Sequence, residues 1–284
     1  MERAGIILAA GQGTRMKSAL PKVMHRVAGL PLLGHVIAAM KGAEIGRIVV
    51  VTAPQMEDVR AFAESQGAKC AVQQEQLGTG HAAACAAPLL KDFSGALIVS
   101  YGDMPLVTAK TFEDSFAARE RAGMAVVAFT SENPSYGRVI VDDGLLYRIV
   151  EARDADEHQK KVKLCNAGIM AADSKLFFRW AAMLKNENNQ REYYLTDIPA
   201  LARDEGVGCA VVEAEEREMM GVNSRAELAA CEAVMQQRLR TRALDAGVGM
   251  IAPDTVFLSH DIMLEADVQI GAYAACRPRY GPSI

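Results

Sequence analysis

Short apolar runs alternate along residues 1–222 with longer stretches in which apolar residues recur every three or four positions. The short runs predict strands, and several are apolar throughout, as expected when both faces of a sheet are covered. The longer stretches predict helices with one buried face. We predict strands at residues 5–10, 47–52, 69–72, 96–100, 124–130, 137–141 and 208–212, and helices that include 32–41, 56–66, 80–90 and 108–122.

This alternation of strands and helices predicts an α/β fold with a doubly wound, mostly parallel sheet over residues 1–223. In such sheets ligands bind beyond the carboxyl ends of the strands. Polar residues that directly follow a predicted strand are therefore the first candidates for functional chemistry.

The pattern changes after residue 223. Residues 224–247 have helical spacing, which we interpret as a linker helix, although a packed helix of the main domain would give the same pattern. Over residues 248–284, apolar residues recur every six positions, which predicts the start of a left-handed parallel β-helix of one or two coils; chance spacing in an apolar tail is the alternative. The first column is Val256, Ile262, Val268 and Ala274, and the second is Leu258, Leu264, Ile270 and Cys276.

Composition narrows the class of protein. Half of the 284 residues are hydrophobic, so a sizeable core can form. The formal net charge is -4 and the basic residues are dispersed, which argues against nucleic acid as a partner. The six cysteines are far apart with no C-x-x-C pair, as is typical of a reduced, cytoplasmic protein. We also expect neither a signal peptide nor a membrane span.

A glycine-rich loop follows the first predicted strand, and it contains Gly11 and Gly13 and is followed by Arg15 and Lys22. Backbone N–H groups in such a loop can face an anion, and the two cations add positive charge, so the pattern predicts a nucleotide phosphate site. It lacks the P-loop pattern, and the third glycine of a dinucleotide fingerprint would fall at Met16. The alternative is a tight turn with solvated basic side chains.

A second stretch, residues 73–82, combines glutamines with Gly78, Thr79 and His81. The Gln73 amide can read a pyrimidine edge, because it carries both a donor and an acceptor. Gly78 and Thr79 allow the backbone to approach a planar base, while His81 is interpreted as a structural residue of the first helical turn. A polar loop that caps the following helix is the alternative.

A third stretch ends the strand at residues 96–100 with Tyr101, Gly102 and Asp103. A carboxylate at this position is well placed to hold Mg²⁺, which needs only one or two carboxylates besides substrate phosphates. The alternative is a turn aspartate before Pro105.

Four shorter pieces carry an acid or an amide close to a glycine or a strand end, at Gly137, Glu151, Asn166 and Asn223. Each is weak alone, because such residues usually make turns. As a set, one acid and two amides suit a sugar that carries hydroxyl and acetamido groups. Residues 190–197 could pack near the same pocket.

Taken in order, these motifs resemble the sugar-nucleotidyltransferase family, and most closely the uridyltransferase half of the bifunctional bacterial enzymes that make UDP-N-acetylglucosamine. The resemblance covers about residues 4–250. It implies a Rossmann-like nucleotidyltransferase fold and the reaction of UTP with N-acetylglucosamine 1-phosphate to give UDP-N-acetylglucosamine and pyrophosphate. The product is a peptidoglycan and lipopolysaccharide precursor.

The resemblance also implies roles for individual residues. The uridine contacts of the family match Leu8, Ala9, Ala10, Gly11, Gln73, Gly78 and Thr79, and its motif around the metal-binding aspartate adds Tyr101 and Gly102. Arg15 and Lys22 match the phosphate contacts, and Asp103 and Asn223 match the two Mg²⁺ ligands. Gly137, Glu151 and Asn166 match the sugar contacts. The expected catalytic residues are Arg15, Lys22 and Asp103.

The chain departs from the family pattern at Ser224, where a second Asn is usual, and at Ala167, where Thr is usual. The full-length family continues into a β-helix that trimerises and carries an acetyltransferase, so we expect no acetyltransferase activity from these 284 residues. Three other functions stay open: a nucleotidyltransferase for another base or sugar, a non-catalytic nucleotide-sugar binding module, and an oligomerisation subunit built on the tail.

Overall fold

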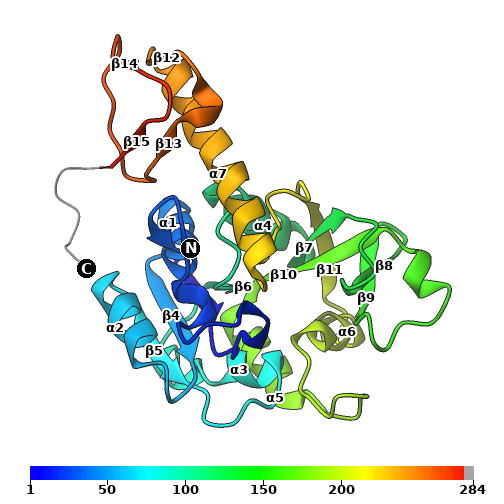
Figure 1. The fold of residues 1–284 in the computed structure, drawn as a ribbon. Helices are drawn as coiled ribbons and strands as arrows, with labels where there is room; N and C mark the ends of the chain where they lie inside the picture. Colours follow the sequence, from blue (N-terminus) through cyan, green and yellow to red (C-terminus); the bar gives the residue numbers. More distant parts are fainter. Residues whose placement is uncertain (278–284) are drawn as a thin grey trace.

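A nine-stranded mixed sheet forms the centre of the computed structural model, which describes residues 1–277 (Figure 1). Seven strands follow the order β11-β7-β10-β6-β1-β4-β5, and β8 and β9 form a hairpin attached to β10. The strands are β1 (Arg3–Leu8), β4 (Arg47–Thr52), β5 (Lys69–Val72), β6 (Ala96–Tyr101), β7 (Gly123–Thr130), β8 (Arg138–Asp142), β9 (Leu145–Val150), β10 (Leu164–Asp173) and β11 (Gly208–Glu213). A separate short hairpin is formed by β2 (Arg26–Val27) and β3 (Leu30–Pro31).

The predicted strands all form, and β1, β4, β5 and β6 pair in parallel as expected. The sheet differs from the prediction at β10, which lies antiparallel between β6 and β7. The sequence did not predict β10 as one strand, because Asn166 and Gly168 interrupt its apolar run. The pairing register with β7 shifts at the same place, between Asn166 and Met170, where Gly168 has a positive φ. This irregularity matters for the site, since it places Asn166 at the edge where β6 ends.

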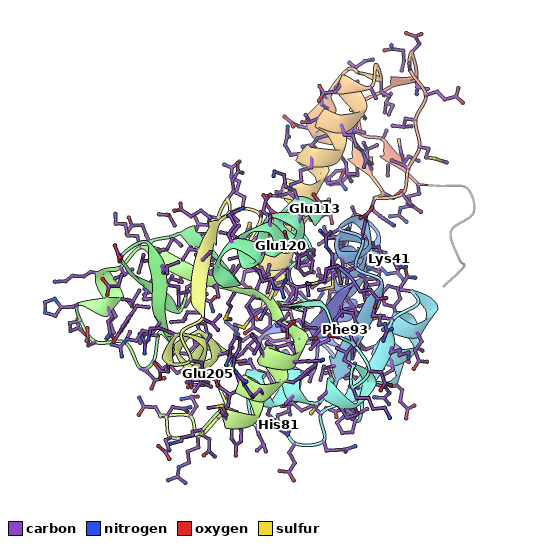
Figure 2. All side chains as sticks on the ribbon, turned by 180° about the vertical axis from the view of Figure 1, so that it is seen from behind. Lys41, His81, Phe93, Glu113, Glu120 and Glu205 are labelled. Carbon is purple, nitrogen blue, oxygen red and sulfur yellow. The ribbon has the colours of Figure 1, made fainter. Side chains whose placement is uncertain are left out.

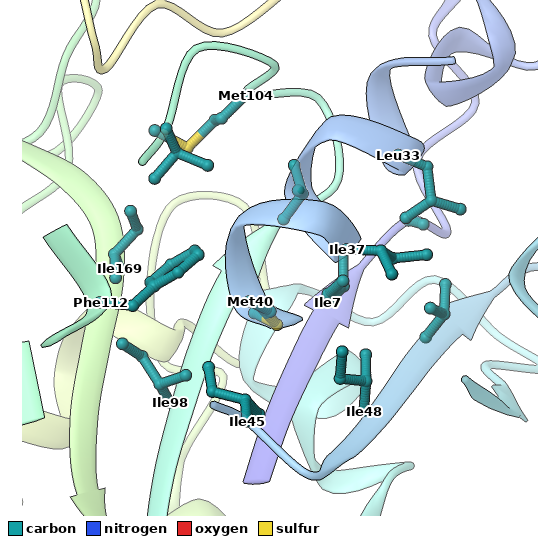
Figure 3. Close-up of a cluster of buried hydrophobic side chains, with 14 of the residues drawn as sticks. Ile7, Leu33, Ile37, Met40, Ile45, Ile48, Ile98, Met104, Phe112 and Ile169 are labelled. Carbon is teal, nitrogen blue, oxygen red and sulfur yellow. The ribbon is translucent and has the colours of Figure 1, made fainter. Parts of the chain in front are cut away.

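Alternate residues of the central strands face two separate hydrophobic layers. Ile7 and Ile98 pack under the helices α1 (Leu32–Gly42), α2 (Glu57–Ser65) and α4 (Ala109–Ala122). Figure 3 shows Ile7 and Ile98 with Ile37 and Met40 of α1 and Phe112 of α4. Because side chains along a strand point alternately to opposite faces, the neighbouring residues Ile6, Leu8, Leu97 and Val99 pack on the other side.

The second layer is covered by α3 (Thr79–Ala84), α5 (Ser174–Met183) and α6 (Ile198–Asp204). The helix predicted at residues 80–90 is shorter than expected and is followed by a 3₁₀ turn at Ala87–Leu89. Pro88 explains this, since proline cannot donate the backbone hydrogen bond that would continue an α-helix. The outer faces are charged, as at Lys41, Glu113 and Glu120 (Figure 2).

The long helix α7 (Arg225–Asp245) leads from the sheet domain to the C-terminal strands (Figure 1). There β12 (Gly249–Met250) pairs in parallel with β14 (Gln269–Ile270), and β13 (Phe257–Leu258) with β15 (Ala275–Cys276). Phe257 thus faces Ala275, three six-residue periods later. Val256, Leu258 and Ile270 are buried against α7, whereas Val268 is exposed. The parallel pairing and the buried columns are those of a β-helix start rather than of chance spacing.

All six cysteines are free. Within residues 1–277, no helix combines the length and the apolar character that a membrane crossing requires.

Candidate functional site

A cavity of about 510 Å³ opens beyond the carboxyl ends of β1, β5 and β6. The predicted site residues come from these ends and from five other segments, and all of them except Arg15 and Gly102 line this one cavity. Those that line it are Leu8, Ala9, Ala10, Gly11, Lys22, Gln73, Gly78, Thr79, Tyr101, Asp103, Gly137, Glu151, Asn166 and Asn223. The loop that follows β1 therefore shares a cavity with Asn223, which lies more than 200 positions later in the chain.

The glycine-rich loop is shaped by Gly13 rather than by Gly11. Gly13 has φ +61°, and a Cβ atom there would lie 2.6 Å from Cβ of Lys22. Only glycine permits both the backbone conformation and this close approach. Gly13 thus sets the path by which the chain returns to bring Lys22 into the cavity.

Arg15 and Gly102 lie outside the cavity lining. Arg15 is exposed on the 3₁₀ turn Thr14–Met16. Gly102 is buried, and a Cβ atom there would contact Ile7, Ala9 and Leu33. Gly102 therefore packs beneath the site. The phosphate contact expected of Arg15 remains a prediction.

Lys22, Asp103 and Asn223 form a polar cluster in the cavity. The Lys22 ammonium forms an ion pair with the Asp103 carboxylate and donates a hydrogen bond of 2.9 Å to Oδ1 of Asn223. The backbone holds the two acceptors together, because the N–H of Val222 donates to the carbonyl oxygen of Asp103 at 2.9 Å. A carboxylate and an amide oxygen that both face one cation are hard oxygen donors of the kind that bind Mg²⁺.

One wall of the cavity is the loop from Gln73 to the start of α3. Gln73 is buried, and its Nε2 donates to the Gly78 carbonyl oxygen at 3.1 Å and lies 3.0 Å from Nδ1 of His81. Gln76 donates from Nε2 to the Ala10 carbonyl oxygen at 2.6 Å, which joins this loop to the glycine-rich one. The two loops therefore form one continuous wall.

The segment at residues 190–197 supports this wall from outside. The N–H of Gly80 donates to the Tyr193 carbonyl oxygen at 2.8 Å, and the N–H of Leu195 donates to Oγ1 of Thr79 at 3.0 Å. Gly78 packs so closely here that a Cβ atom would lie 2.6 Å from the Tyr193 carbonyl oxygen. The segment thus packs against the loop that lines the site, as the sequence indicated.

The opposite wall contains Glu151 and Asn166. Oδ1 of Asn166 accepts a hydrogen bond of 3.0 Å from the N–H of Gly168, and its backbone N–H donates to the Gly137 carbonyl oxygen at 2.9 Å. Glu151 accepts a hydrogen bond of 2.9 Å from Oγ1 of Thr196. Burial raises the pKa of Glu151 above its ordinary value, although the Thr196 hydroxyl acts in the opposite direction.

Tyr101 lies close both to Asp103 and to the wall that contains Glu151. It is the last residue of β6, and its ring packs on Gly168, where a Cβ atom would lie 1.9 Å from the ring. Burial, together with the nearby charges of Glu151 and Asp103, raises the pKa of the Tyr101 hydroxyl, so this group stays protonated and can donate a hydrogen bond.

Four polar residues that were not among the predicted site residues also line the cavity: Gln76, Ser135, Tyr136 and Glu192. Gln76 and Tyr136 lie within or beside stretches that the sequence singled out. The only signal for Glu192 is its place in the segment at residues 190–197, since no local pattern marks it as facing a ligand.

Comparison with solved structures places this fold among nucleotidyltransferases. An inositol-1-phosphate CTP transferase from T. maritima aligns over 80% of this chain and 91% of its own, with a TM-score of 0.62 and 17% identity. A putative glucose-1-phosphate thymidylyltransferase from Bacillus anthracis aligns over 82% and 94%, with a TM-score of 0.63 and 22% identity. Both likenesses show that the chain has the fold of these two proteins.

The family follows from the sequence comparison. The family described as a MobA-like NTP transferase domain matches residues 5–173, and the chain belongs to this family. It is 46% identical to "Bifunctional protein GlmU" of Hyphomonas neptunium over the whole chain, and 47% identical to the protein of the same name from Rhodospirillum rubrum over 93% of the chain. These matches span 62% and 60% of those relatives' own lengths. The predicted fold class and nucleotidyltransferase family are confirmed.

Proposed function

We propose that this chain transfers UMP from UTP to N-acetylglucosamine 1-phosphate, with release of pyrophosphate. The observation that carries the proposal is that Lys22, Asp103 and Asn223 share one cavity with Glu151 and Asn166. A cluster suited to phosphates and a divalent cation thus faces a wall suited to a sugar with hydroxyl and acetamido groups. The identity with proteins named GlmU supports the same substrates.

The donor set at Asp103 and Asn223 fits Mg²⁺. Both oxygens already face a cation, the Lys22 ammonium, so the position favours positive charge. Within residues 1–277 no cluster of three or more His, Cys, Asp and Glu side chains could hold a metal. This agrees with a site that two side chains and substrate phosphates complete together. When bound, Mg²⁺ would neutralise charge on the phosphates and favour attack on the α-phosphorus.

The protein's task in this reaction is positioning, because no protein nucleophile is needed. The sugar phosphate is mostly a dianion near neutral pH, its second pKa being about 6. Its oxygen attacks the α-phosphorus of UTP in line, and pyrophosphate leaves with the electrons of the broken bond. The Lys22 ammonium can turn from Asp103 towards the phosphates and stabilise the charge that develops there, and Arg15 is expected to do the same from the loop.

The remaining residues hold the two substrates in that geometry. The loop from Leu8 to Gly11 and the wall at Gln73 and Gly78 would hold the uridine, while Glu151, Asn166 and Gly137 would hold the sugar. Correct alignment of two polyanions is itself a large part of the rate enhancement in such reactions. The free cysteines are consistent with the cytoplasmic location proposed for this activity.

The direct test is pyrophosphate release from UTP, Mg²⁺ and N-acetylglucosamine 1-phosphate, with glucose 1-phosphate as a competing acceptor. Asp103→Ala should lower kcat by roughly 100-fold or more, since the carboxylate proposed to hold Mg²⁺ at the reacting phosphates is lost. Asp114→Ala is the matched control, because this carboxylate lies on the surface of α4, where it pairs with Lys110. A folded protein that binds UDP-N-acetylglucosamine but releases no pyrophosphate would favour a non-catalytic binding module instead.

A further inference from the structure

The side-chain amide of Gln73 is held in one orientation by two acceptors. Its Nε2 lies 3.1 Å from the Gly78 carbonyl oxygen and 3.0 Å from Nδ1 of His81. A carbonyl oxygen can only accept a hydrogen bond, so the side of the amide that faces Gly78 must be the NH₂ group. The hydrogen bond to the Gly78 carbonyl oxygen therefore fixes which end of the Gln73 amide is the nitrogen and which is the oxygen.

His81 takes the second hydrogen of the same NH₂ group. For this its Nδ1 must be the unprotonated ring nitrogen, with the proton on Nε2. His81 lies in the first turn of α3 (Figure 2), and its ring centroid is 6.4 Å from that of Tyr193. Both hydrogens of the Gln73 amide are thus used inside the protein.

What remains available to a ligand is the oxygen of Gln73. Gln73 lines the cavity, and among the described residues its Oε1 has no hydrogen-bond partner. Facing ring position 3 of a pyrimidine, this oxygen accepts a hydrogen bond only from a base that carries an N–H there. Uracil and thymine carry an N–H at ring position 3, whereas cytosine has an unprotonated nitrogen there, which would face Oε1 lone pair to lone pair.

We propose that His81 is a positioning residue that sets base selectivity: by taking the second amide hydrogen of Gln73, it leaves an acceptor alone facing the cavity. The site then favours uracil-type bases over cytosine. This inference rests on the proposed function in one respect, namely that the pyrimidine of the nucleotide occupies the Gln73 side of the cavity with ring position 3 towards Oε1. It changes the interpretation of His81, which the sequence indicated only as a structural residue of the helix.

Two substitutions separate this role from a merely structural one. His81→Leu removes the acceptor, so one Gln73 N–H loses its partner and only the Gly78 carbonyl oxygen holds the amide in this orientation. His81→Asn keeps the acceptor, because Oδ1 of Asn stands at the same branch position as Nδ1 of His. The measurement is kcat/KM for pyrophosphate release with UTP and with CTP, together with the equilibrium dissociation constants of both triphosphates by calorimetry.

The wild type should prefer UTP over CTP, and His81→Leu should reduce that preference roughly tenfold, about the contribution of one buried hydrogen bond. His81→Asn should keep it within about threefold. An unchanged UTP:CTP ratio in a folded His81→Leu variant, or a wild type that binds CTP as tightly as UTP, would overturn the inference. If no triphosphate gives pyrophosphate, the proposed transfer fails, and the binding ratios still decide the role of His81.

Discussion

The carboxylate of Glu227 accepts a hydrogen bond of 2.8 Å from the backbone N–H of Asn223. The same carboxylate accepts from Oγ of Ser224 at 3.0 Å, and Oγ of Ser224 accepts from the backbone N–H of Glu227 at 3.2 Å. This arrangement resembles a capping box at the start of α7, but the carboxylate accepts from the N–H of Asn223, one residue before the N-cap Ser224. The end of the helix thereby fixes the backbone of the residue that is proposed to bind Mg²⁺.

Glu227→Ala should therefore affect both stability and metal dependence. Loss of the cap should cost about 1 kcal/mol of unfolding free energy, and loss of the backbone anchor should weaken apparent Mg²⁺ affinity roughly 10–100-fold. Thermal unfolding and Mg²⁺ titration of pyrophosphate release measure the two effects.

The control for Glu227→Ala is Asp173→Ala, which removes the N-cap of α5, where the Asp173 side chain accepts from the N–H groups of Lys175 and Leu176. This variant should lose similar stability and keep its Mg²⁺ dependence. Glu227→Gln should keep most of both properties, because glutamine also forms capping boxes. Equal Mg²⁺ dependence in Glu227→Ala and Asp173→Ala would contradict the link to Asn223.

Thr196→Val should weaken binding of the sugar phosphate. Glu151 lines both the site cavity and a second cavity of about 540 Å³, and the Thr196 hydroxyl donates a hydrogen bond to its carboxylate. Loss of one hydrogen bond of about 1 kcal/mol should raise KM for the sugar phosphate about fivefold with little change in kcat. Thr196→Ser, which keeps the hydroxyl, should restore KM; a KM unchanged in Thr196→Val would show that this bond does not position Glu151.

Gly168→Ala should damage the site more than its backbone conformation alone explains. Gly168 has φ +77°, and the new methyl group would overlap the Tyr101 ring. Gly144 has φ +75°, and no atom lies within 4 Å of the position that its Cβ atom would take, so Gly144→Ala isolates the backbone cost. We expect Gly144→Ala to lose roughly 1 kcal/mol and Gly168→Ala a further 1–3 kcal/mol or so.

Chemical denaturation measures both losses, and calorimetry with UDP-N-acetylglucosamine should show weakened binding only for Gly168→Ala. Equal losses of stability in the two variants would mean that the Tyr101 ring moves aside at no cost.

Glu151→Gln should change how stability depends on pH. Burial raises the pKa of Glu151 above its ordinary value of 4.5, so the folded protein disfavours the charged form. The stability that this carboxyl contributes is fully present below its unfolded-state pKa and is lost as pH rises through the raised pKa. Glutamine does not ionise, so the variant should be more stable than the wild type at pH 8, and this difference should shrink as pH falls. Chemical denaturation of both proteins from pH 5 to pH 8 tests this prediction. A stability difference between variant and wild type that grows towards low pH would contradict it.

The sequence predicted those parts of the site whose signals are local. The glycine-rich loop, Gln73 and Asp103 each follow an apolar strand, and parallel strands bring their carboxyl ends to one edge of the sheet. The six-residue columns likewise predicted the parallel pairs of β12 with β14 and β13 with β15, because a repeat in sequence gives a repeat in space.

The rest depends on contacts between distant segments. The position of β10 between β6 and β7 is set by pairing over long separations, and its shift at Asn166 breaks the apolar run that would mark a strand. The orientation of the Gln73 amide depends on two acceptors, Gly78 and His81, whose geometry no spacing reveals. Glu192 lines the cavity because the segment at residues 190–197 packs against the Gln73 loop.

The most direct test of the proposed transfer is ³¹P NMR of a single mixture of UTP, Mg²⁺ and N-acetylglucosamine 1-phosphate, with wild type and with Asp103→Ala. We expect the wild type to form UDP-N-acetylglucosamine and pyrophosphate in equal amounts and Asp103→Ala to form almost none. Unchanged substrates with a folded wild-type protein, or equal product formation by Asp103→Ala, would contradict the proposed reaction and its metal site.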